Sequence, residues 1–126
     1  MITPEQIAKA GTEHSHQVAL FVWAQQSGIP ELKWLFAIPN GGPRTAIAGA
    51  KLKAEGVKPG VPDLFLPVPR GSKFGLWIEL KKPKGIVSNE QHKWLEFLSI
   101  RGYATRVCFG WQEARDALKE YLGYAV

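Results

Sequence analysis

The stretch that decides the fold runs from residue 62 to residue 81 and reads PDLFLPVPRGSKFGLWIELK. Two apolar runs, Asp63–Val68 and Gly75–Lys81, flank the turn-forming residues Pro69-Arg70-Gly71-Ser72. This pattern predicts a β-hairpin. Because both runs are apolar on both faces, we expect helices to cover the sheet on its two sides.

Charged residues stand at one end of this predicted hairpin. Asp63 begins the first strand, and Glu79 and Lys81 end the second. The start of one hairpin strand lies beside the end of the other, and strand residues two apart share a face, so these three side chains should converge. One or two carboxylates, with water and phosphate oxygens, are typical ligands of Mg²⁺, and a nearby ammonium stabilises charge that develops on a phosphate. The alternative is a surface salt bridge worth ~0–1 kcal/mol.

The remaining elements predict an α/β fold, with a mixed sheet flanked by helices, in a single domain over residues 1–126. Thr3 and Ser88, with Gln6 and Gln91 three residues later, are typical of capping boxes that begin helices. In the first long helix we expect the stripe Val18, Phe21, Val22 and Gln25 to be buried. Helices are expected at about 4–10, 12–26, 44–55, 88–101 and 111–122, and further strands at 34–38 and 103–109.

Composition restricts the class of protein and of partner. The chain has 126 residues with a formal net charge of +5, so a polyanionic partner is expected. One cysteine, Cys108, excludes a disulfide framework. No apolar run reaches the ~20 residues that span a bilayer, and the N-terminus does not resemble a secretory signal. We therefore expect no membrane association and a cytoplasmic location.

Four segments taken together resemble the VRR-NUC family, the virus-type replication-repair nucleases of the PD-(D/E)XK superfamily. They are Asn40-Gly41-Gly42, the run GAKLKAEGVKPGVPD at 49–63, Glu79-Leu80-Lys81, and Ser88-Asn89-Glu90-Gln91. The resemblance covers about Glu13 to Ala117 and is closest to a stand-alone member of phage or bacterial origin. It implies the PD-(D/E)XK restriction-endonuclease-like fold and Mg²⁺- or Mn²⁺-dependent cleavage of branched DNA.

The resemblance also implies roles for individual residues. Glu13, Asp63 and Glu79 would be metal ligands, with the backbone carbonyl of Leu80, while Lys81 would be the catalytic lysine. Gln91 would line the site from a helix. The candidate DNA-binding residues, which are mostly basic, are Asn40, Gly41, Gly42, Arg44, Lys51, Lys53, Lys58, Lys82 and Lys84.

Several alternatives stay open from sequence alone. We expect a homodimer that resolves four-way (Holliday) junctions, because two sites are needed for two opposed cuts; the alternative, a flap-type nuclease, needs a single cut. A basic nucleic-acid-binding module without catalysis, or an interaction protein whose charge is incidental, would need no clustered carboxylates. His14 and His16 point in nearly opposite directions on a helix, so we expect surface histidines rather than a zinc site.

Overall fold

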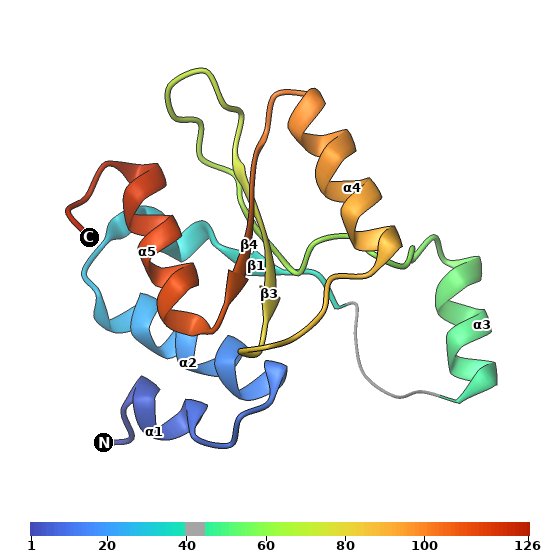
Figure 1. Cartoon of the computed structure of the whole chain (residues 1–126), viewed down its shortest axis with the longest axis horizontal. Helices are drawn as coiled ribbons and strands as arrows, with labels where there is room; N and C mark the ends of the chain where they lie inside the picture. The colour runs from blue at the N-terminus through green and yellow to red at the C-terminus, as the bar shows by residue number, and fades with distance from the viewer. Residues whose placement is uncertain (40–44) are drawn as a thin grey trace.

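A four-stranded mixed sheet organises the computed structural model, which describes residues 1–39 and 45–126 (Figure 1). The strands lie in the order β1 (Phe36–Ala37), β2 (Leu64–Leu66), β3 (Leu76–Lys81) and β4 (Ala104–Phe109). The first three pair antiparallel, and β4 joins β3 in parallel. The predicted hairpin is thus confirmed, and the sheet is mixed because β3 and β4 are connected through a helix.

Helices cover both faces of this sheet (Figure 1). Helix α2 (Glu13–Gln26) and helix α5 (Trp111–Leu122) pack together on one face, and helix α4 (Asn89–Ile100) packs against β4 on the other. Helix α1 (Pro4–Ala8) lies against α2. Helix α3 (Ala46–Ala54) stands away from the sheet beyond α4 and has no buried residue (Figure 1). None of the helices in the two described ranges is long and apolar enough to cross a membrane.

The main core lies between the sheet and the pair α2 and α5. Leu76, Ile78 and Leu80 of β3 point into it and are at most 2% exposed, as residues two apart on a strand should. Their neighbours Trp77, Glu79 and Lys81 therefore belong to the opposite face, under α4. The strand that carries the candidate catalytic residues is thus fixed by a well-packed apolar row on its other side.

The start and end signals in the sequence are largely confirmed. Thr3, Thr12 and Ser88 are the N-caps of α1, α2 and α4, each in a capping box. One expected strand is much shorter than predicted, because residues Pro30–Trp34 form a 3₁₀-helix and only Phe36–Ala37 pair with β2. Proline at the first position favours this helical turn over an extended strand.

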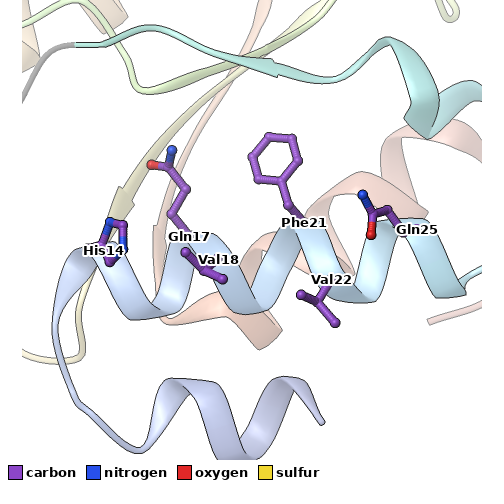
Figure 2. A pocket seen from close by; sticks show the side chains of 6 residues that line it. All are labelled: His14, Gln17, Val18, Phe21, Val22 and Gln25. Carbon is purple, nitrogen blue, oxygen red and sulfur yellow. The ribbon is translucent and has the colours of Figure 1, made fainter. Parts of the chain in front are cut away.

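The predicted buried stripe of α2 is largely wrong, since Val18 and Gln25 are exposed and Phe21 is only partly buried against the core. Val18, Phe21, Val22 and Gln25 line an open groove together with His14 and Gln17 (Figure 2). The helix instead turns Ala19, Leu20 and Ala24 to the core. Since α2 is apolar on both sides, periodicity alone did not identify the inner one, and the small alanines fit closely against α5 and β3.

Candidate active site

The β2–β3 hairpin brings Asp63 to the end of β3. Leu64 pairs with Ile78, so the residue before β2 lies beside the residues after Ile78. The Asp63 Oδ2 atom accepts a hydrogen bond of 2.9 Å from the backbone N–H of Leu80. This contact fixes the carboxylate next to the peptide bond between Glu79 and Leu80, close to the end of β3, as the sequence predicts.

Glu79 is a buried carboxylate, with only 1% of the residue exposed. Its Oε2 atom accepts a 3.0 Å hydrogen bond from Nε2 of Gln91. The Oε1 atom is buried and has no hydrogen-bond partner among the described residues. An oxygen in this state costs free energy unless something positive or hydrogen-bonding occupies the space beside it.

Gln91 makes hydrogen bonds both in the N-terminal cap of α4 and to Glu79 in the candidate site. Its backbone N–H donates to Ser88 Oγ at 3.2 Å, and its Oε1 atom accepts from the backbone N–H of Ser88 at 2.8 Å, which completes the capping box of α4. The amide nitrogen is then left to face Glu79. The capping box therefore orients the side chain that holds the buried carboxylate.

The surroundings of Glu79 disfavour its charge. Burial raises the pKa of Glu79 from its ordinary value to about 9, and the hydrogen bond and negative charge of Asp63 act in the same direction. The ammonium of Lys81 lowers this pKa, but less than burial and Asp63 raise it. Glu79 therefore tends to hold a proton in the metal-free protein, and a bound cation would favour its carboxylate form instead.

Lys81 is the cation that the structure places beside these acids. Its side chain is 9% exposed, and Nζ lies 3.8 Å from Glu79 Oε2 and 4.0 Å from Glu13 Oε2. Glu13 starts helix α2, and its side chain is 48% exposed. The lysine therefore bridges the end of the sheet and the start of α2, with loose rather than close ion pairs.

The predicted site residues divide into three groups. Asp63, Glu79, Leu80, Lys81 and Gln91 come together. Glu13 reaches Lys81, but in the described part of the chain no three His, Cys, Asp or Glu side chains are grouped to hold a metal ion. The predicted DNA-binding residues Asn40, Gly41, Gly42 and Arg44 lie outside the described residues.

The other predicted DNA-binding residues are all exposed lysines. Lys51 and Lys53 lie on α3, Lys58 follows that helix, and Lys82 and Lys84 follow β3. Exposed ammonium groups near an acidic centre are suited to contacts with phosphates.

The donor set fits a hard divalent cation. Asp63 and Glu79 offer carboxylate oxygens on adjacent strands, and Glu79 Oε1 is the buried oxygen that lacks a partner among the residues described. Two carboxylates with room for water and phosphate are what Mg²⁺ typically uses.

Sequence reasoning missed the role of His16. The prediction of a surface histidine is wrong, since His16 is 7% exposed and its Nδ1 atom accepts a 3.0 Å hydrogen bond from the backbone N–H of Trp111. Burial also lowers the pKa of this imidazole. Gly110, the N-cap of α5, has no side chain to offer, and its N–H donates to the Lys81 carbonyl oxygen at 2.7 Å. His16 thus caps α5 from another helix, and the missing cap at Gly110 is the only sequence signal for it.

Comparison with known proteins identifies the chain. The family model described as "VRR-NUC domain" matches residues 10–112. The chain belongs to the VRR-NUC family. A solved structure named "VRR_NUC domain protein" is similar to it over 90% of both chains, with 28% sequence identity and a TM-score of 0.77. A search of curated proteins gave no significant match.

Membership confirms the predicted family and fold. The VRR-NUC domain has the PD-(D/E)XK-like fold, here a four-stranded mixed sheet with helices on both faces. It makes this chain a nuclease of the PD-(D/E)XK type, a class that generally uses divalent metals and acts on DNA.

Proposed function

We propose that this VRR-NUC protein is an endonuclease that uses Mg²⁺ or Mn²⁺ to hydrolyse phosphodiester bonds in branched DNA. The observation that carries the proposal is the buried Glu79 beside Asp63, whose Oε1 atom has no hydrogen-bond partner among the described residues and whose other oxygen lies 3.8 Å from the Lys81 ammonium. A protein that only binds DNA gains nothing from burying two carboxylates near a polyanion. The arrangement serves catalysis instead.

Asp63 and Glu79 would hold the metal, together with the Leu80 carbonyl, and Glu13 would join them through α2. When bound, the cation supplies a polarised phosphate and an activated water. Gln91 keeps Glu79 facing the site. Lys81 lies where an ammonium can orient the attacking water and stabilise charge on the phosphate oxygens. The products expected for this family carry 5′-phosphate and 3′-hydroxyl ends.

Exposed lysines support DNA as the substrate. Lys51 and Lys53 lie on α3 and Lys58 follows it, while Lys82 and Lys84 directly follow β3, and Arg44 and the Asn40-Gly41-Gly42 segment complete the candidate set. Phosphate contacts of this kind hold DNA without reading its sequence. Such a surface gives no preference for base sequence.

We also propose that the protein acts on four-way junctions as a homodimer. One chain carries one site, and resolution needs two opposed cuts, which a two-fold dimer supplies with matching symmetry. Tyr121 and Leu122 make contacts within the chain. Leu122 is buried, and the Tyr121 hydroxyl donates to the Val68 carbonyl oxygen at 2.6 Å. The exposed Val126 and the groove on α2 remain as apolar surface for a partner.

A substrate panel tests the proposal. Flaps, forks, four-way junctions and plain duplex would be incubated with the protein in Mg²⁺, Mn²⁺, Ca²⁺ or chelator. Cleavage of branched DNA in Mg²⁺ or Mn²⁺ and none in chelator is expected. Salt-dependent binding without cleavage in any metal would favour the binding module, and single cuts by a strict monomer would favour a flap-type nuclease.

A further inference from the structure

Helix α4 carries a partly exposed aromatic stripe beside its buried side. Its core side is formed by Leu95 and Leu98, which are 9% and 7% exposed. Trp94, Phe97 and Arg101, at intervals of three and four residues, share a neighbouring side of the helix and form what we call the α4 stripe. Phe97 is 50% exposed, with the Arg101 guanidinium 4.9 Å from its ring centre.

The indole of Trp94 is held rigidly. Its Nε1–H donates to the Pro59 carbonyl oxygen at 3.1 Å, and its ring meets that of Phe97 edge-on at 6.3 Å. Gly60 packs so closely on α4 that a Cβ atom there would lie 2.6 Å from the Glu90 backbone carbon. The ring is therefore fixed in place before any ligand arrives, which lowers the entropic cost of binding.

Two apolar hollows lie beside Trp94. One of about 320 Å³ is lined by Lys93, Trp94 and Phe97, and another of about 280 Å³ lies between Trp94, Val57 and Lys58. The second hollow also borders the active site, because its wall residue Ile38 donates its backbone N–H to the Asp63 carbonyl oxygen at 2.7 Å. Aromatic faces next to the site are thus open to a planar group.

The charges around the stripe favour an anionic ligand. Lys58, Lys93 and Arg101 are exposed there, against one acidic side chain, Glu90, on the same side of α4. The stripe spans about 10 Å from Trp94 to Arg101 at about 1.5 Å per residue, and successive phosphates of one DNA strand advance about 3.4 Å. Planar apolar bases joined by regularly spaced phosphates match this surface in both chemistry and length.

We propose that the α4 stripe is a stacking platform for unpaired nucleobases of a single-stranded arm next to the cut site. The inference rests on the proposed function, since it assigns part of the branched substrate to a surface. Gln91, which holds Glu79, begins the same helix, so an arm stacked on Trp94 and Phe97 leads directly to the catalytic carboxylates. The platform makes the enzyme prefer junctions that expose unpaired bases.

Binding measured in chelator tests this without any cleavage. Fluorescence anisotropy would compare a fork with single-stranded dT arms and a blunt duplex of equal length, for the wild type, Phe97→Ala and Trp94→Ala. Phe97→Ala should weaken binding of the fork roughly tenfold, equivalent to about 1.4 kcal/mol, and leave duplex binding within about twofold. Trp94→Phe should recover part of the loss in Trp94→Ala. Ser99→Ala is the control, because Ser99 is exposed and, two residues after Phe97 at about 100° per residue, lies on the opposite side of α4.

Two results would overturn the platform: unchanged fork affinity in Phe97→Ala, or an equal loss for fork and duplex. Light scattering on the same variants supplies a third, since dissociation of a dimer by Phe97→Ala would make the stripe a protein interface. Failure of the proposed function is recognised separately. If no metal supports cleavage, yet the arm-dependent loss is seen, the platform stands without the nuclease.

Discussion

The sheet face under α4 has two halves that differ in what they do for the protein. Towards the start of β3, Trp77 stacks on Phe65 with ring centres 4.2 Å apart, and Tyr103 meets both rings edge-on. Two residues later the same face carries the buried Glu79, and two residues after that Lys81. The aromatic half stabilises the fold, whereas the charged half costs stability in return for a reactive site.

A rigid β3 strand allows the protein to keep the destabilising charged half of this sheet face in place. A carboxylate in an apolar interior turns towards solvent or takes up a proton, unless several contacts hold its side chain in place. Here the apolar row of Leu76, Ile78 and Leu80 fixes β3 from behind, and Gln91 and the Leu80 N–H fix the two acids. Changes in the charged half should therefore alter catalysis, while those in the aromatic half should alter stability.

The largest effect is expected at Lys81. Lys81→Ala should lower the single-turnover cleavage rate about a hundredfold or more, because the ammonium acts on charge in the transition state. Lys81→Arg should not rescue fully, since a planar guanidinium differs from a compact ammonium. Rapid-quench cleavage at saturating DNA measures the rate. Weaker DNA binding with an unchanged saturating rate would instead make Lys81 a steering residue.

In the aromatic half, Trp77→Ala should reduce the free energy of unfolding by about 3 kcal/mol, because it removes the stack on Phe65 and leaves a cavity. Urea unfolding followed by circular dichroism measures this. At a temperature where the variant is folded, cleavage should stay near the wild-type rate.

Trp77→Phe is the matched variant for that experiment. It keeps an aromatic ring and removes a buried Nε1–H that has no partner within the described ranges, so the loss should be clearly smaller. If Trp77→Ala abolished cleavage while folded, the separation between the two halves would be wrong.

In the charged half, Glu79→Gln should stabilise the metal-free protein, and the gain should grow with pH. Burial and the neighbouring Asp63 raise the pKa of Glu79 from its ordinary value of 4.5 to about 9 in the folded protein. Between pH 4.5 and about pH 9 the unfolded chain binds fewer protons than the folded protein, so the stability of the wild type falls as pH rises. Gln does not titrate, so the Glu79→Gln variant does not lose this stability. The expected gain is on the order of 2 kcal/mol at pH 8.

Urea unfolding in chelator at pH 5.5, 7 and 8.5 measures that dependence. Glu96→Gln, an exposed change on α4, is the control and should follow the wild type. A Glu79→Gln variant that is less stable than wild type at pH 8 would mean that the pair with Lys81 is net stabilising.

A smaller effect is expected at His16, which links α2 to the end of β3 through the cap of α5. His16→Ala should cost about 1 kcal/mol, the usual worth of a helix cap, and His16→Asn should restore part of it by offering an acceptor oxygen. The folded pKa of His16 is lowered. Its contribution is therefore present above pH 6.5 and lost as pH falls through the folded pKa.

Thermal unfolding of both His16 variants between pH 5 and 8 measures this contribution. His14→Ala is the matched control, because it removes an exposed histidine from the same helix. Equal pH profiles for His16→Ala and the wild type would show that the imidazole cap is not the titrating contact.

Much of the fold and site could be predicted because the signals were local or fixed by strand geometry. The hairpin turn and the period of two along β3 sufficed to place Asp63 beside the end of that strand. The sequence did not show which side of α2 faces the core, because Val18 and Phe21 are as apolar as Leu20. Packing against α5 determines which of these residues is buried. The buried role of His16 depends on Trp111, 95 residues away, and no local pattern reports such a contact.

The central claim is that the charged half is a metal-dependent nuclease centre, and Glu79→Gln tests it most directly. The measurement pairs the single-turnover cleavage rate in Mg²⁺ with the DNA dissociation constant in Ca²⁺, and Asp63→Asn is measured alongside. We expect the rate to fall at least about a hundredfold, equivalent to about 2.7 kcal/mol, while the dissociation constant stays within a few fold. A folded Glu79→Gln variant that cuts at more than roughly a tenth of the wild-type rate would contradict the account.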